Sequence, residues 1–228
     1  MYKYLRNAYT ENHVSTIKPE YKLENLHKNL KIKHGSFKEE LPEQIMAVQF
    51  ITGNEKVLEI GGNIGRNSLI IAKLLKEDKN LVVLETISDS IKKLEENKKI
   101  NNMSFHIEPS ALSKRKLIQK GWNSIPSPTL IPGYVPVNII DFDNLQKKYN
   151  IIFDTLVLDC EGAFYYILKD MPEILNNIKL IITENDYSDI KEYNFVKENL
   201  EKHGFKLTYS KAGGWGPCQK NFFEVWKK

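Results

Sequence analysis

Short apolar segments that alternate with amphipathic stretches constrain the fold of this chain more than any other feature of its sequence. From Lys56 onward the alternation is typical of βαβ units, in which helices cover both faces of a parallel sheet. It predicts strands at 56–60, 81–85, 103–107, 155–159, 180–184, 206–209 and 222–226. Apolar residues at helical spacing predict helices at 64–76, 87–98 and 192–203. We therefore predict a Rossmann-like α/β domain with a seven-stranded, mostly parallel sheet and helices on both faces.

Two regions depart from this rhythm. Residues 1–50 are polar and predict helical segments that form either a cap over the site or a packing extension of a domain at 51–228. Residues 108–136 contain five prolines and predict an irregular excursion from the sheet. Long excursions of this kind often carry functional residues.

Composition favours a soluble, cysteine-poor protein. A hydrophobic content of 41% in 228 residues is enough for one buried core. There is no apolar run long enough to cross a membrane and no signal-peptide pattern, so we expect a cytoplasmic protein without a membrane span. The two cysteines, Cys160 and Cys218, are predicted to be reduced thiols. The net charge of +4 is spread along the chain and favours a solvated surface over a nucleic-acid-binding patch.

A glycine-rich turn follows the first predicted strand, in the sequence Glu-Ile-Gly-Gly-Asn-Ile-Gly at 59–65. Glycines there let the backbone approach a ligand closely, and the helix behind them presents free N–H groups. A dinucleotide fingerprint would place glycines two and five positions after Gly61, but Asn63 and Arg66 stand there. The turn therefore argues against NAD.

Glu59 and the glycine spacing favour S-adenosylmethionine instead, whereas Glu85 is compatible with an adenosine ligand of either kind. Glu59 can accept hydrogen bonds around the ammonium end of the methionine moiety, and S-adenosylmethionine has no pyrophosphate to bind. Glu85, at the end of the second predicted strand, can accept hydrogen bonds from both ribose hydroxyls. The predicted cofactor contacts from these segments are Glu59, Gly61, Gly62, Asn63, Gly65 and Glu85.

Polar residues also end the fourth and fifth predicted strands, where open α/β sheets bind their ligands. Asp159 is predicted to remove a proton from the acceptor, with Glu161 as a second candidate, although Asp159 could instead cap the next helix. Asp159, Glu184 and Asn185 could also supply oxygen ligands to Mg²⁺. The alternative is that Glu184 orients a loop while Asn185 and Asp186 cap a helix.

Several of these segments occur together in a characteristic order. They are the glycine turn at 59–65, the acid at 85, Ala-Leu-Ser at 111–113, the acid-bearing turn at 140–145 and Asp-Cys-Glu-Gly at 159–162. In that order they resemble the FkbM family of methyltransferases, from about residue 35 to the C-terminus. The resemblance implies S-adenosylmethionine as methyl donor, O-methylation of a sugar or another hydroxyl-bearing metabolite, and cofactor contacts at Ser110, Ala111 and Asp159.

The sequence departs from this family pattern at three positions. Glu59 and Gly62 replace the frequent Asp and Ala, and Phe164 stands where an acid often follows the Glu-Gly pair. Phe164 therefore leaves the details of the acceptor site open. His34, just before a Gly-Ser pair, is a further catalytic candidate at the entrance of the pocket.

Three function classes are compatible with these residues. The leading one is a small-molecule or glycan O-methyltransferase. A nucleic-acid methyltransferase, acting on RNA or a cap, is favoured by the basic net charge but lacks the Asn/Asp-Pro-Pro-Tyr/Phe motif that would hold a base amine. A non-catalytic adenosine-binding module is the third, and the intact glycine turn with Asp159 argues against it. The oligomeric state is not predicted.

Overall fold

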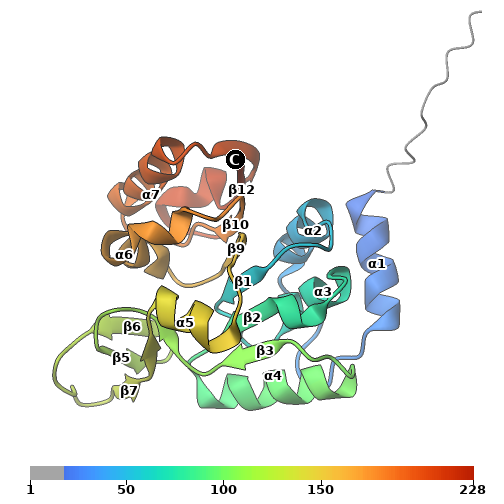
Figure 1. Cartoon of the computed structure of the whole chain (residues 1–228), viewed down its shortest axis with the longest axis horizontal. Coiled ribbons are helices and arrows are strands. Elements are labelled where there is room, and N and C mark those ends of the chain that lie inside the picture. The colour runs from blue at the N-terminus through green and yellow to red at the C-terminus, as the bar shows by residue number, and fades with distance from the viewer. Residues whose placement is uncertain (1–17) are drawn as a thin grey trace, which may run out of the picture.

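The computed structural model describes residues 18–228 and contains the predicted seven-stranded sheet (Figure 1). The strand order is β11-β12-β10-β9-β1-β2-β3. All neighbours pair in parallel except β12, which is antiparallel to both β10 and β11. The strands are β1 (Val57–Ile60), β2 (Leu81–Leu84), β3 (His106–Glu108), β9 (Thr155–Leu158), β10 (Leu180–Glu184), β11 (Lys206–Lys211) and β12 (Phe223–Lys227). The predicted fold class is confirmed, with strand ends shifted by a few residues.

Helices cover both faces of this sheet (Figure 1). One face carries α1 (Pro19–Asn29), α2 (Leu41–Phe50), α3 (Arg66–Leu74) and α4 (Ser88–Ile100). The other carries α5 (Phe142–Tyr149), α6 (Ala163–Asp170) and α7 (Ile190–Lys202). Short 3₁₀ turns are η1 (Asp78–Asn80), η2 (Pro172–Leu175) and η3 (Gly216–Asn221). No helix among the described residues is long and apolar enough to cross a membrane.

Strand alternation divides the core into two layers. Leu58 and Ile60 of β1 pack with α5, α6 and α7, whereas Val57 packs with the helices of the opposite face. Successive side chains of a strand point to opposite faces, so Glu59 shares the face of Val57. A buried carboxyl on β1 thus lies under α2 and α3 rather than under α6.

The segment predicted to be irregular is instead a small sheet. Its strands β5 (Leu117–Lys120), β6 (Asn123–Pro126) and β7 (Val135–Val137) form an antiparallel sheet in the order β6-β5-β7, while β4 (Ala111–Leu112) pairs with β8 (Ile139–Ile140). The prediction of an irregular excursion is wrong because Pro126 and Pro136 both lie on edge strands, which can lack an N–H donor. In Figure 1 this sheet projects from the main body beside α5.

The N-terminal helices pack onto the domain. Met46 and Ala47 of α2 are buried in the same core layer as Val57. Gln44 is fully buried, its amide donates to the backbone carbonyls of Phe37 and Glu39, and its Oε1 lies 2.7 Å from His27 Nε2. These contacts join α2 to the loop before it and to α1. The first part of the proposed 1–50 extension, residues 1–17, lies outside the described residues.

Candidate functional site

The glycine turn after β1 brings two strand ends into close contact. Gly61 and Gly62 both donate their N–H groups to the carbonyl of Leu84, at 3.0 Å. Gly61 has a φ of +92°, and a Cβ placed on it would lie 1.6 Å from the backbone oxygen of Asp159. The structural requirement for glycine at position 61 is therefore contact with the β9 end, in addition to the predicted access for a ligand.

The other two glycines of the turn serve packing. A Cβ on Gly62 would lie 2.1 Å from Val83 Cγ1, and one on Gly65 would lie 2.3 Å from Leu94 Cδ1. Both glycines therefore let the turn pack against β2 and α4. Gly62 lines a small acidic pocket described below, whereas Gly65 lines neither cavity of the site.

Glu85 is held in place at the end of β2. Its Oε1 accepts hydrogen bonds from the N–H groups of Thr86 and Ile87, each at 2.7 Å, and its Oε2 accepts from Asn63 N–H at 2.8 Å. The side chain is only 6% exposed but lines a cleft. An ionised carboxylate has about four acceptor positions, so three protein donors leave room for a ribose hydroxyl.

A cleft of about 450 Å³ lies at the carboxyl ends of β1, β2 and β9. Most of the predicted site residues line it, namely Gly61, Asn63, Glu85, Ser110, Ala111, Asp159 and Glu161. This volume is within the range of small-molecule sites. The structure therefore brings together the residues of four separate sequence segments.

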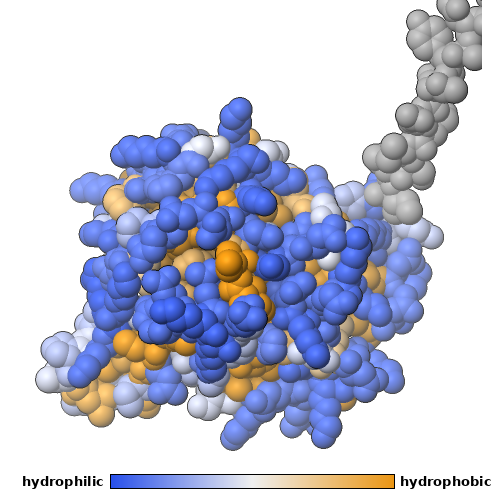
Figure 2. Space-filling view, in the orientation of Figure 1, coloured by the Kyte–Doolittle hydropathy of each residue, from blue (hydrophilic) through white to orange (hydrophobic). Residues whose placement is uncertain are grey.

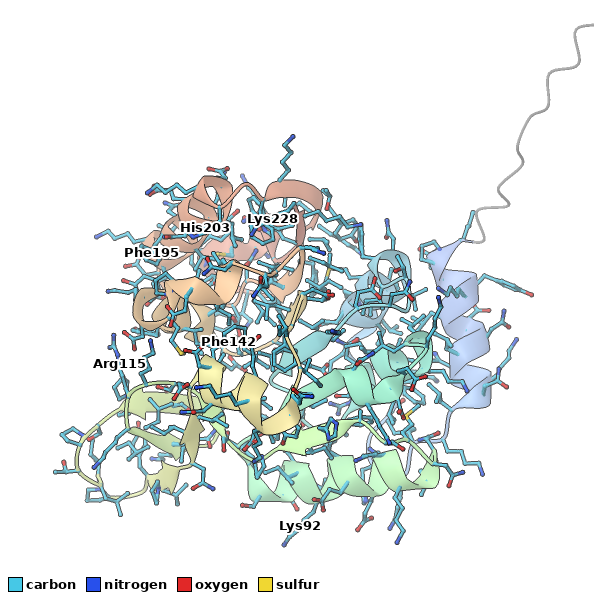
Figure 3. The ribbon with its side chains drawn as sticks, in the orientation of Figure 1. Lys92, Arg115, Phe142, Phe195, His203 and Lys228 are labelled. Carbon is cyan, nitrogen blue, oxygen red and sulfur yellow. The ribbon has the colours of Figure 1, made fainter. Side chains whose placement is uncertain are left out.

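The cleft has an outer wall that the sequence analysis did not identify. It comprises Trp122 in the β5–β6 turn, Arg115 ahead of β5, and Tyr166 and Asp170 of α6. The Arg115 guanidinium pairs with the Asp170 carboxylate through two hydrogen bonds of 2.5 Å, and Figure 3 labels Arg115 between the small sheet and α6. Trp122 remains 56% exposed. The turn dipeptide Gly121-Trp122 was the available sequence signal, but its partner strand was not predicted.

A second, much smaller pocket of about 10 Å³ adjoins this cleft, because Gly61 and Asp159 line both. Its walls carry five carboxyl groups, those of Glu40, Glu43, Glu59, Asp159 and Glu184. We call these five residues the acidic pocket.

Burial dominates the electrostatics of the acidic pocket. Desolvation raises the pKa of Glu59 to about 8, and desolvation together with the neighbouring carboxyl of Glu43 raises the pKa of Glu184 to about 10. The pKa of Asp159 is also raised well above its usual range, by burial first and then by Glu40, Asp186 and other acids. Carboxyls that cannot find counterions in a low-dielectric site tend to keep their protons.

The predicted magnesium ligands do not come together. Asn185 is buried with its amide donating to the carbonyl of Asn221 at 2.8 Å and to Glu224 Oε2 at 3.0 Å, so it holds η3 and β12 instead of facing Asp159. Among the described residues, no group of three or more His, Cys, Asp or Glu side chains is arranged to hold a metal ion. Asp159, Glu184 and Asn185 therefore do not form the predicted magnesium site.

The capping alternatives are also wrong. The N-cap of α6 is Gly162, with no side-chain cap, so Asp159 does not cap that helix. Asp189 caps α7 by accepting from Lys191 N–H, whereas Asp186 accepts from Gly162 N–H at 2.7 Å.

His34 lies away from the cleft. Its Nε2 is 2.7 Å from Glu96 Oε2 of α4, and its backbone N–H donates to Asn97. It lines neither the large cleft nor the acidic pocket. The prediction of a catalytic His34 is therefore not supported, because its ring is engaged in a surface ion pair.

Comparisons with known proteins identify the fold. No protein-family model matches the chain, and no curated protein sequence matches it. A ribosomal protein L11 methylase from Lactobacillus delbrueckii subsp. bulgaricus has a similar structure, with a TM-score of 0.50, 11% identity, and coverage of 86% of this chain and 79% of that chain.

Two further solved structures are similar. A candidate tRNA (m1A22) methyltransferase from Streptococcus pneumoniae, in complex with S-adenosyl-L-methionine, has a TM-score of 0.50 and 11% identity over 84% of this chain and 72% of that one. An O-methyltransferase from Bacillus cereus, in complex with SAH, has a TM-score of 0.48 and 14% identity, with coverage of 96% of this chain and 94% of that chain. Taken with the strand order, the two structures with a TM-score of 0.50 show that this chain has the Rossmann-like fold found in methyltransferases.

Proposed function

We propose that this protein is an S-adenosylmethionine-dependent O-methyltransferase that acts on a hydroxyl of a sugar, a glycan or a related small metabolite. The observation that carries the proposal is Glu85, a buried carboxylate oriented by three backbone N–H groups at the end of β2. Such a group suits a ribose hydroxyl, and it faces a cleft that has room for a nucleoside and an acceptor.

The residues present fit the proposed cofactor. Glu85 would bind the ribose, Ser110 and Ala111 would lie beside the base, and Gly61 and Asp159 would lie near the methionine end, because they separate the cleft from the acidic pocket. Glu59 Oε2 is buried without a hydrogen-bond partner in that pocket, as expected for a carboxylate that awaits a cationic group. When bound, S-adenosylmethionine supplies an electrophilic methyl group.

Asp159 is the proposed base for the acceptor hydroxyl. Its raised pKa makes it a stronger base than an exposed carboxylate once it is ionised, and it lines the acceptor cleft. Glu161 lines the same cleft with a φ of +51°, a backbone conformation that non-glycine residues rarely adopt, and is the second candidate.

The charge of the cleft favours a small neutral acceptor over a nucleic acid. Its lining includes five carboxyls, those of Glu85, Asp159, Glu161, Asp170 and Glu192. The cation on that lining is Arg115, which is already paired with Asp170. Phosphate backbones require unpaired cations, whereas the exposed rings of Trp122 and Tyr166 suit the apolar face of a sugar. This acceptor class is also the one implied by the FkbM-like motifs.

Calorimetric titration and an acceptor screen test this proposal. We expect S-adenosylmethionine and S-adenosylhomocysteine to bind and NAD to give no heat. We then expect a panel of sugars, nucleotide sugars, lipids and RNA to yield S-adenosylhomocysteine with a saccharide and not with RNA. Binding of NAD alone would contradict the cofactor assignment, and salt-sensitive turnover of RNA would move the acceptor to the nucleic-acid class.

A further inference from the structure

Glu43 of α2 is a buried carboxyl that the proposed chemistry does not use. It is 9% exposed, and its Oε2 has no hydrogen-bond partner. Glu59 is 3% exposed, and its Oε2 is likewise without a partner, while its Oε1 accepts one long hydrogen bond of 3.3 Å from Asn67. Both side chains line the acidic pocket. Two orphaned carboxylate oxygens in one cavity are costly unless a cation or protons are bound there.

We propose that α2 completes the cofactor site, with Glu43, Glu59 and Glu184 forming a pocket for the α-ammonium group of the methionine moiety. The inference rests on the proposed function, and it assigns to the N-terminal helix a direct role in cofactor recognition. Glu43 comes from α2, Glu59 from β1 and Glu184 from β10, so three elements converge on one point.

Strand geometry explains why the two strand acids meet under α2. Glu59 shares the sheet face of Val57, and Glu184 shares that of Leu180 and Ile182, which belong to the same core layer. Asp159 directly follows β9, the strand between them, and completes the row. Helix α2 packs against β10 and α3, which places Glu43 above this row.

Of the five carboxyls of the acidic pocket, Glu40 alone has an ion-pair partner among the described residues. Arg66 of α3 is the nearby cation, and its guanidinium pairs with Glu40 at 2.6 Å and with Glu39. Asp186, which follows β10, and Glu161 add further negative charge beside Asp159. The raised pKa values of Glu59 and Glu184 reflect this shortage of positive charge as well as burial.

The size of the pocket selects the kind of cation. A volume of about 10 Å³ holds roughly one water-sized group, which is the size of an ammonium head. Mg²⁺ requires octahedral coordination and usually keeps several waters, so it needs more room than this. An ammonium tethered to the ligand in the adjoining cleft would enter past Gly61 and Asp159, which line both cavities.

Two ligands that differ at the methionine end provide the test. S-adenosylhomocysteine carries the α-ammonium group, whereas 5′-methylthioadenosine retains the nucleoside and the sulfur but lacks it. We expect E43Q to weaken the affinity for S-adenosylhomocysteine at least about tenfold in calorimetric titration, because a charge-assisted hydrogen bond is lost. The affinity for 5′-methylthioadenosine should not change. E24Q, the same charge change at an exposed position on α1, is the matched control and should change neither affinity.

Each other outcome overturns the inference in a distinguishable way. If E43Q binds S-adenosylhomocysteine as tightly as the wild type, α2 has no role in recognition, although the proposed function stands. If E43Q weakens both ligands equally, Glu43 acts on the fold rather than on the ammonium. If Mg²⁺ alone raises the melting temperature of the wild type but not of E43Q, the pocket binds a metal. If the wild type binds neither nucleoside, the proposed function fails as well.

Discussion

Glu59 and Glu85 stand near the ends of neighbouring parallel strands, yet their surroundings differ. Glu85 accepts three short hydrogen bonds from backbone N–H groups, whereas Glu59 accepts one long bond from Asn67 and leaves Oε2 unpaired. The loop after β2 donates backbone N–H groups to Glu85, while Glu59 lies beside other acids under α2. Protein donors hold the Glu85 carboxylate in place without a ligand, whereas Glu59 Oε2 has no hydrogen-bond partner.

This difference indicates how the Glu85 end and the Glu59 end of the proposed site would each recognise a ligand. A carboxylate fixed by protein donors presents its remaining lone pairs in a set direction, which suits neutral hydroxyl groups and costs little reorganisation. A cluster of unpaired carboxyls gains most from a cation, since the cation relieves repulsion that the free protein must tolerate. Figure 2 shows one face of the molecule that is largely hydrophilic, whereas Glu43 and Glu59 are buried.

The largest effect should arise at Asp159, where the two cavities meet. D159N keeps the shape of the side chain but removes the base, so we expect turnover to fall by about 10² to 10⁴. S-adenosylhomocysteine affinity should change much less. Single-turnover rates and calorimetric titration of the same preparation measure the two quantities. Full activity of D159N would transfer the role of base to Glu161.

Loss of Glu85 should affect affinity instead of chemistry. E85A removes the acceptor for the ribose hydroxyls, and we expect the cofactor to bind roughly tenfold or more weakly. It also leaves the N–H groups of Thr86 and Ile87 without their partner, so circular dichroism must first show that the variant is folded. A folded E85A with unchanged affinity would mean that the ribose binds elsewhere.

Sequence periodicity was sufficient to predict the main sheet. The strands from Val57 to Ile60 and from Leu81 to Leu84 are continuous apolar runs because both faces are buried, and such runs are visible without a structure. The bounds of helices α5 and α6 were not predicted, because each has eight residues, too short for a periodic pattern to stand out. The small sheet was missed because its prolines are tolerated at edges, a property of pairing that composition cannot show.

The position of Glu85 and Asp159 at the cleft was predictable, because each directly follows a buried strand. The site was not predictable where distant segments meet. Glu43 lies in α2, well before Glu59 and far from Glu184 in sequence, and no local pattern marks it as a partner of either. His34 failed as a candidate for the same reason, since its partner Glu96 comes from α4.

The crowded carboxyls should make the ligand-free protein less stable as pH rises. Glu59, with a pKa of about 8, and Glu184, with a pKa of about 10, bind protons more tightly in the folded state than at the ordinary glutamate value of 4.5. The folded state therefore binds more protons between pH 5 and 8, and the free energy of unfolding falls across that window, by up to the order of 1 kcal/mol per pH unit.

Thermal melts at several pH values measure this slope. We expect E59Q to flatten the decline and to melt higher than the wild type at pH 8, because an amide does not ionise. Saturating S-adenosylhomocysteine should also flatten the decline of the melting temperature with pH, since its ammonium group would supply a positive charge beside these carboxyls. A wild-type melting temperature that rises from pH 5 to pH 8 would show that these carboxyls are stabilised in some other way.

The smallest effect is expected at the outer wall, where Arg115 joins the small sheet to α6. The side chains of Arg115 and Asp170 are 42% and 20% exposed, and partly exposed ion pairs contribute about 0.2 to 1 kcal/mol, so R115A should barely change the melting temperature. Because the pair joins the segment before β5 to α6, and Trp122 and Tyr166 line the cleft on either side of it, we expect the KM for the acceptor to rise several-fold while cofactor affinity stays constant. K114A is a matched control, since Lys114 joins the same segment to η2 through Glu173 and to α6 through the backbone carbonyl of Asp170, but does not line the cleft. Equal effects of R115A and K114A on KM would assign Arg115 to general attachment of the small sheet and not to the geometry of the acceptor wall.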